Sequence, residues 1–249
     1  MLRYLRHPYL LSRAVLRPVD IWKSKRHELR LSEYNKYSMP FERSIALLVK
    51  SNADGLMAEL EGSDFLRHIE YCVKQLEGTG SIDTESGMLL YLLTRTLHPE
   101  IVVETGVAKG ISSSFILKGL DQNNRGKLYS IDLHCREGVA VPLDRKLGWA
   151  IPEELKFKWS LILGESTKVL PKLLRDIGNV DIFFHDSRHT YKNMISEYNI
   201  VWPYLRAGGL LLSDDATSND AFLDFADSVN QKPAIVFSRI GAICKNSKN

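Results

Sequence analysis

Apolar and polar positions divide the chain into two parts with different periodicities. Between residues 41 and 77, apolar side chains recur every three or four positions, which is typical of amphipathic helices. From Asp83 onward short apolar runs alternate with helical patterns, and the first helix is predicted at 84–93, after capping residues. The later runs predict strands at 100–105, 127–132, 158–164, 180–185 and 209–213, separated by helices at 111–121, 166–176, 190–205 and 217–230.

The alternation of strands and helices predicts a parallel sheet, because each strand is joined to the next by a right-handed helical crossover. The last two apolar runs, 234–238 and 240–244, lie too close together for a crossover and are expected to form an antiparallel pair. We therefore expect an α/β fold with a doubly wound, Rossmann-like, mostly parallel sheet that ends in a C-terminal antiparallel hairpin. Residues 1–80 should form a basic arm and a helical appendage, and residues 81–249 the main domain.

The composition is that of an ordinary soluble globular protein, with 44% apolar and 25% charged residues among 249. No run of about 18 apolar residues is present, so no membrane span is expected. Basic residues interrupt the apolar runs near the start, which argues against a signal peptide. The three cysteines, Cys72, Cys135 and Cys244, show neither disulfide nor zinc spacing, and this pattern favours a reducing, cytoplasmic location.

The positive charge of the chain is concentrated in residues 1–30, which contain eight Lys and Arg residues and two acidic residues, a net charge of +6. The whole chain carries +3, so the remaining 219 residues carry −3. This basic leader could contact an anionic membrane surface peripherally, bind an acidic partner, or pack as an arm on its own chain. Pro8 and Pro18 interrupt any long helix in the leader, which weakens the membrane interpretation.

A pair of glycines follows the strand predicted at 100–105 and precedes a helix. Gly106 allows a tight turn, and Gly110 allows the loop to approach a ligand and the helix to pack closely. Ser112 or Ser113 can cap that helix, whose N-terminus suits an anion such as a carboxylate. Glu104 at the strand tip attracts a cationic ammonium, so the loop fits an amino-acid moiety better than a pyrophosphate.

The glycine spacing is G-x-x-x-G, which differs from the dinucleotide motif G-x-G-x-x-G, and no G-K-[ST] phosphate loop follows. Asp132 ends the next predicted strand and is placed to accept hydrogen bonds from ribose hydroxyls, although it could instead cap a helix. Glu165 and Ser166 follow the third strand, where they could face an adenine or simply cap the next helix.

Two further apolar runs end in carboxylates: Asp186 follows the run at 180–185, and Asp214 and Asp215 follow the run at 209–213. The carboxyl ends of parallel strands meet at one edge of a sheet, where open α/β folds bind ligands. Three carboxylates in one place repel each other unless a cation or a shared proton relieves them. The sequence thus predicts either a divalent metal site or an acid–base site beside a small-molecule pocket.

The order of these motifs, E-T-G-x-x-x-G, S-I-D, G-E-S, H-D-S-x-H-T-Y and G-G-L-L-L-S-D-D, resembles class I S-adenosylmethionine-dependent methyltransferases. It is most similar to the small-molecule O-methyltransferases that act on sugars and natural products in bacteria, and it spans residues 80–245. The resemblance implies a seven-stranded sheet with an antiparallel hairpin at one edge. It also implies a cofactor site made by Glu104, Gly106, Ala108, Gly110, Ser112, Ser113, Asp132, Gly164, Glu165 and Ser166.

The same resemblance implies a role for Mg²⁺, held by Asp186, Asp214 and Asp215, in activating a substrate hydroxyl. Asp186 is then a candidate general base, and His189 is its rival. Many relatives have D-G-x-H where this chain has Asp186-Ser-Arg-His189, so Arg188 places a positive charge beside the expected metal. This charge could recognise an anionic substrate group or point to solvent, and it puts metal occupancy in question.

Two other functions compete with a methyltransferase acting on a hydroxylated small molecule. An NAD-dependent oxidoreductase is disfavoured by the glycine spacing and by the C-terminal hairpin, and a non-catalytic scaffold is disfavoured by the retained acids. A nucleic-acid substrate is not expected, because no Asn/Asp-Pro-Pro-aromatic segment is present to stack a flipped base. The helical segment 20–77 could form a lid over the pocket or a contact in a homo-oligomer.

Overall fold

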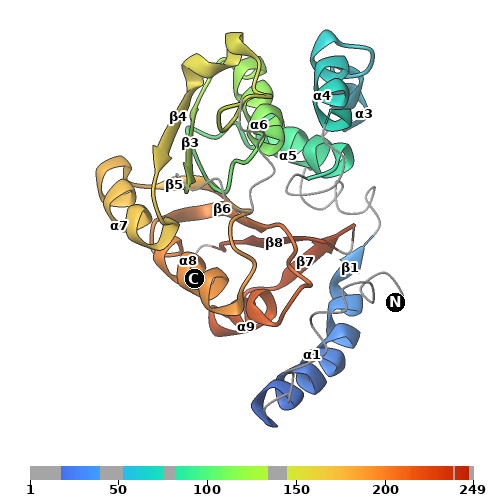
Figure 1. Cartoon of the computed structure of the whole chain (residues 1–249), viewed down its shortest axis with the longest axis vertical. Helices are drawn as coiled ribbons and strands as arrows, with labels where there is room; N and C mark the ends of the chain where they lie inside the picture. The colour runs from blue at the N-terminus through green and yellow to red at the C-terminus, as the bar shows by residue number, and fades with distance from the viewer. Residues whose placement is uncertain (1–17, 40–52, 76–81, 134–144, 238, 247–249) are drawn as a thin grey trace.

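The computed structural model describes residues 18–39, 53–75, 82–133, 145–237 and 239–246. In this part of the chain the strands form a single mixed sheet of eight, in the order β1-β7-β8-β6-β5-β2-β3-β4 (Figure 1). The strands are β1 (Ser38–Met39), β2 (Ile101–Thr105), β3 (Lys127–Asp132), β4 (Trp159–Leu163), β5 (Val180–His185), β6 (Leu205–Ser213), β7 (Pro233–Val236) and β8 (Ile240–Cys244). The helices are α1 (Pro18–Tyr37), α3 (Ala53–Ala58), α4 (Asp64–Lys74), α5 (Thr84–Leu97), α6 (Ile111–Gln122), the 3-10 helix η1 (Glu153–Lys158), α7 (Ser166–Ile177), α8 (Tyr191–Val201) and α9 (Ala221–Ser228).

The α/β fold and the pairing of the strands confirm the sequence prediction. Strands β4, β3, β2, β5 and β6 pair in parallel, whereas β8 pairs antiparallel with both β6 and β7. All seven predicted strands are present and form the expected sheet, and the two-residue strand β1 extends its edge by pairing with β7. A strand of two residues has no periodicity that a sequence pattern could reveal.

Two predicted helices are shorter than expected. The helix predicted at 190–205 ends at Val201, two residues before Pro203, which has no N–H group to continue the helical hydrogen bonds. Strand β6 therefore begins at Leu205, four residues before its predicted start at 209. The helix predicted at 217–230 begins only at Ala221, after a turn in which Asp215 has a φ of +45°.

Helices cover both faces of the sheet, and side chains that alternate along each strand reach both layers (Figure 1). On β5, Ile182 and Phe184 pack toward α4, α5 and α6, whereas Phe183 packs toward α7, α8 and α9. Both faces are apolar because parallel strands are joined by helices that bury them. The arrangement leaves the carboxyl ends of the parallel strands free to form a site.

The predicted boundary at residue 80 does not divide the hydrophobic core. Leu60, Phe65 and Ile69 precede the boundary, yet they are buried in the same cluster as residues of β2, β5 and β6. The residues around the predicted boundary, 76–81, and the first seventeen residues of the basic leader lie outside the described residues. Helices α3 and α4 are therefore part of the main body rather than a separate lobe.

Helix α1 directs two of the leader's arginines at an acidic face of α9. Arg26 Nη2 lies 2.7 Å from Asp224 Oδ1, and Arg30 Nη2 lies 2.6 Å from Asp227 Oδ2. His27 Nδ1 adds a contact of 2.8 Å to Asp220. These ion pairs agree with the interpretation of this part of the leader as an arm on its own chain. Within the described residues, no helix has the length and apolar character needed to cross a bilayer.

Candidate active site

One cavity of about 380 Å³ opens at the edge of the sheet where the parallel strands end. A cavity of this size suits a small ligand. Ten residues predicted from sequence line it: Gly106, Ala108, Asp132, Gly164, Glu165, Ser166, Asp186, His189, Asp214 and Asp215. It is also lined by Val107, Ile131, Leu133, Ser187, Arg188, Asn193 and Arg239. The structure thus joins the predicted cofactor loop and the predicted acids in one space.

Four other residues of the predicted cofactor site do not line the cavity. Glu104 is fully buried beneath the loop and accepts hydrogen bonds from the hydroxyls of Ser112 (2.5 Å), Ser113 (2.5 Å) and Ser130 (2.7 Å). Burial raises the pKa of Glu104 to about 6, although the three hydroxyls partly offset this effect. The carboxyl group therefore ties α6 to β2 and β3, and it does not face an incoming ammonium group.

The helix cap predicted at Ser112 or Ser113 is wrong, because both hydroxyls bond to Glu104 instead. The N-cap of α6 is Gly110, which has a φ of +90° and no side chain to form a cap. A Cβ atom at Gly110 would lie 2.8 Å from Gly148 Cα, so this glycine allows close packing rather than contact with a ligand. With no side-chain cap, the first N–H groups of α6 keep their capacity to bind an anion.

The turn at Gly106 forms the floor of the cavity. Its φ of +88° favours glycine, and a Cβ atom there would lie 2.1 Å from the carbonyl oxygen of Asp186. Asp132 Oδ2 fixes the loop by accepting hydrogen bonds from the N–H groups of Val107 (2.8 Å) and Ala108 (2.9 Å). Since a carboxylate has about four acceptor positions, Asp132 can still accept a ribose hydroxyl at the cavity wall.

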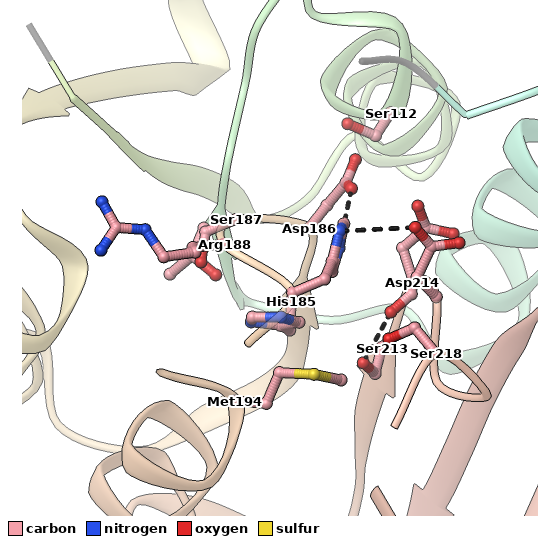
Figure 2. A network of polar contacts seen from close by, with 12 residues as sticks. Ser112, His185, Asp186, Ser187, Arg188, Met194, Ser213, Asp214 and Ser218 are labelled. Carbon is pink, nitrogen blue, oxygen red and sulfur yellow. Dashed lines mark hydrogen bonds and ion pairs between the residues drawn. The ribbon is translucent and has the colours of Figure 1, made fainter. Parts of the chain in front are cut away.

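Figure 2 shows Asp186 and Asp214 close together after β5 and β6. Asp215 lines the same cavity, and the three residues form the acid cluster. The His189 ring lies among these acids, with Nε2 3.6 Å from Asp186 Oδ1 and Nδ1 3.4 Å from Asp215 Oδ2. Burial and the neighbouring Asp214 raise the pKa of Asp186 well above its ordinary value. Burial and the neighbouring His185 lower the pKa of His189. Both shifts favour the neutral forms of Asp186 and His189.

A cation already contacts the acid cluster, and it is not the one that the sequence indicated. Arg188 is exposed, whereas Arg239, from the turn between β7 and β8, donates hydrogen bonds from Nε and Nη2 to the two carboxylate oxygens of Asp214. The Nε atom of Arg239 also lies 3.4 Å from Asp215 Oδ1. No pattern in the sequence indicated Arg239, because it lies 25 residues beyond Asp214.

The predicted magnesium site is only partly compatible with this arrangement. Asp186, His189 and Asp214 each offer one ligand atom, and the three atoms lie within 4.8 Å of one another. However, both oxygens of Asp214 are bound by the guanidinium of Arg239, and Asp215 is also close to it. A divalent cation would have to displace a positive charge that already neutralises its ligands. The residues as arranged therefore do not fit a bound magnesium ion.

Glu197 is a buried residue that the sequence interpretation missed. Its carboxylate accepts hydrogen bonds from Thr105 Oγ1 (2.6 Å), Ser187 Oγ (2.6 Å) and Ser166 Oγ, and contacts His185 Nδ1 at 2.7 Å. Burial opposes ionisation, but His185 and the hydroxyl donors lower the pKa of Glu197 to about 2. This Glu197 network connects the ends of β2, β4 and β5 beneath the cavity. The available signal was an acid on the otherwise apolar face of α8.

None of the described residues between 18 and 75 lines the cavity, so the described part of the helical segment does not form the expected lid. A role of this segment in a homo-oligomer stays a prediction. Helices α3 and α4 lie beside α5, whereas α1 lies near α9 and β7 at the other end of the molecule (Figure 1).

Residues 103–216 match the sequence model of a family described as a methyltransferase domain. No curated protein sequence matches the chain significantly. Similar solved structures include the SAH-bound methyltransferase PaMTH1 of Podospora anserina, with 15% identity, a TM-score of 0.57, and coverage of 78% of this chain and 95% of that one. The O-methyltransferase TomG of Streptomyces achromogenes, in complex with SAM, has 14% identity, a TM-score of 0.58, and coverage of 75% and 92%.

A methyltransferase from Geobacter sulfurreducens has 18% identity and a TM-score of 0.55, with coverage of 75% of this chain and 90% of that one. At these identities the similarity shows a common fold, which agrees with the strand order and the hairpin described above. Residues 103–216 are therefore similar to a methyltransferase domain, and the fold of the chain is that of solved methyltransferases bound to SAM or SAH.

Proposed function

We propose that this protein transfers the methyl group of S-adenosylmethionine to a hydroxyl group of a small molecule. The observation that carries the proposal is that one cavity is lined both by Gly106 and Asp132 and by Asp186 and His189. Such a cavity can hold a methyl donor and an acceptor side by side, and this proximity supplies much of the rate. The similarity to TomG, which is named an O-methyltransferase, supports a hydroxyl acceptor.

S-adenosylmethionine is expected to lie across the carboxyl ends of the parallel strands. Its ribose is expected at Asp132 and its adenine between Leu133 and the segment Gly164–Ser166, all of which line the cavity. Its methionine carboxylate is expected near the uncapped N-terminus of α6. Because Glu104 is bonded to three serines, recognition of the methionine ammonium falls to other groups at the floor of the cavity.

In this reaction the oxygen of the acceptor attacks the methyl carbon, the bond from carbon to sulfur breaks, and the sulfur keeps the electron pair. The hydroxyl proton needs a base, and the geometry favours His189 over Asp186. A neutral imidazole with its Nδ1 hydrogen directed at Asp215 leaves Nε2 as an acceptor. Nε2 is buried 3.6 Å from Asp186 Oδ1 and has no hydrogen-bond partner among the described residues. The raised pKa of Asp186 instead favours a protonated carboxyl that can donate a hydrogen bond.

Magnesium remains a prediction from the resemblance, and no step of the proposed reaction passes through it. The positive charge beside the acid cluster is that of Arg239.

Calorimetry with S-adenosylhomocysteine tests the cofactor, with NAD as the control ligand. S-adenosylhomocysteine should bind with one site per chain, and NAD should not bind. A panel of hydroxylated acceptors with isotopically labelled methyl donor then tests the reaction. Binding of NAD without binding of S-adenosylhomocysteine would contradict the proposal, as would transfer to amines or thiols alone.

A further inference from the structure

We propose that Arg239 takes the place of the divalent cation expected from the resemblance. Its guanidinium, rather than a metal ion, then offsets the negative charge of the acid cluster. This inference rests on the proposed function, because the acid cluster is assigned to the acceptor end of the cavity. Arg239 is assigned as a positioning residue, since its contacts are with Asp214 and Asp215 rather than with a reacting atom.

The backbone of Arg239 is fixed on both sides. Its N–H group donates to the carbonyl of Val236 at 3.1 Å, within the hairpin turn. Its carbonyl accepts from the N–H group of Ala216 at 2.9 Å, directly after the acid pair. The hairpin and the loop that carries Asp214 and Asp215 are therefore held together at the residue that supplies the charge.

The side chain of Arg239 is shaped for this role. Its Nε and Nη2 atoms form the two-pronged contact with one carboxylate that guanidinium groups make best, and Asp214 is only 1% exposed. Arg239 itself is 32% exposed and lines the cavity. The pair raises the pKa of Arg239, first through the hydrogen bonds to Asp214, so the positive charge is permanent at any working pH.

The guanidinium of Arg239 lies beside two carboxylates of the acid cluster. Its Nε and Nη2 atoms bind both oxygens of Asp214, and Nε lies 3.4 Å from Asp215 Oδ1. The position next to these carboxylates is therefore already occupied by a positive charge of the protein. A divalent cation would find the carboxylate of Asp214 already bound by Arg239, and the positive charge of that guanidinium would repel it.

Titration with Mn²⁺ by calorimetry tests this inference, in protein saturated with S-adenosylhomocysteine. The wild-type protein should show no stoichiometric Mn²⁺ binding, from an equimolar amount up to about a 100-fold molar excess of Mn²⁺ over protein. Arg239→Gln should gain a Mn²⁺ site, because the substitution frees the carboxylates of Asp214 and Asp215. The matched control is Arg188→Gln, which removes an exposed arginine from the same cavity and should gain nothing.

Stoichiometric Mn²⁺ binding by the wild-type protein overturns the inference, and so does a failure of folded Arg239→Gln to bind Mn²⁺. If Arg239→Gln does not fold, the wild-type titration alone decides. Binding of S-adenosylhomocysteine is measured in the same samples, so loss of the proposed function would appear as an empty cofactor site, whereas failure of this inference would appear as a metal in a loaded protein.

Discussion

At the scale of single residues, Asp186 and His189 lie in environments that displace their pKa values in opposite directions. Both groups are largely screened from water, but one gains a neighbouring carboxylate and the other a neighbouring histidine. Desolvation alone would make both neutral, and these neighbours strengthen the effect. The result is a proton donor beside a proton acceptor at the acceptor end of the cavity.

Replacing His189 with Ala should reduce kcat by roughly 100- to 10,000-fold, the usual contribution of a general base. Because its pKa is lowered, His189 is neutral at pH values below the ordinary 6.5, so the acid limb of kcat/KM should have its midpoint below 6.5. The pH profile of the wild-type protein and of His189→Ala checks this, since the limb should vanish in the variant. Loss of the limb in Asp186→Asn, with its retention in His189→Ala, would assign the base to Asp186.

Replacing Gly106 with Ala should abolish binding of S-adenosylhomocysteine, because the added Cβ would meet the backbone of Asp186 at 2.1 Å and the φ of +88° is unfavourable for Ala. The matched control is Gly178→Ala, where φ is also positive (+76°) but no atom lies within 4 Å of the added Cβ. The control should lose some stability and keep its affinity. Calorimetry of both variants distinguishes the two effects, and equal affinities would show that the loop tolerates the extra atom.

At the scale of helices and strands, the Glu197 network is what holds the strand ends in register around the cavity. One carboxylate on α8 contacts side chains from β2, from β5 and from the turn that leads into α7. Gly106 and Asp186, which directly follow β2 and β5, line the cavity, as does Ser166 at the start of α7. The network therefore links the stability of the sheet edge to the shape of the site.

Replacing Glu197 with Gln should lower the free energy of unfolding by roughly 3 kcal/mol, which corresponds to the fall in its pKa from 4.5 to about 2. The sign follows from the lowered pKa. The contribution is fully present above the pKa of the unfolded chain and is lost as the pH falls toward 2. Urea denaturation should therefore show a constant deficit between pH 5 and 8 that shrinks below about pH 4.

The control for Glu197 is Glu70→Gln, at an exposed position of α4, which should change the unfolding free energy by less than about 0.5 kcal/mol. A deficit for Glu197→Gln that stays unchanged at pH 3 would show that its ionisation is not the source of the stability.

At the scale of the whole molecule, residues 60–69 contribute to the core. Leu60, Phe65 and Ile69 are buried in one cluster with residues of α5, α6 and the sheet, and each such side chain contributes about 1.5–3 kcal/mol. Their sum is comparable to the total stability of a typical domain, about 5–15 kcal/mol. Removal of this segment should therefore cost most of the stability of the fold.

A chain of residues 81–249 should fail to unfold cooperatively and should aggregate, whereas a chain of residues 53–249, which keeps α3 and α4, should fold with reduced stability. Thermal unfolding monitored by circular dichroism compares both with the full chain. Cooperative unfolding of 81–249 at the temperature of the full chain would mean that the predicted boundary at residue 80 marks a true domain edge.

The sequence by itself determined the order of strands and helices, the parallel sheet with its terminal hairpin, and the carboxylates at the strand ends. These features depend on local periodicity and on glycine turns, which each segment carries in its own residues. It also placed Gly106, Asp132 and Asp186 correctly at the edge of the cavity. The two-residue β1 escaped prediction, because it is too short for any pattern.

Only the tertiary structure decided which charged and polar side chains contact one another. Glu197 contacts Thr105 across 92 residues of sequence, Arg239 contacts Asp214 across 25, and Glu104 turns away from the cavity to bind three serines. Such pairs are fixed by strand register and helix packing, which no local pattern encodes. The same residue types that predicted a metal site from sequence therefore form, in three dimensions, a cluster whose positive charge comes from the protein itself.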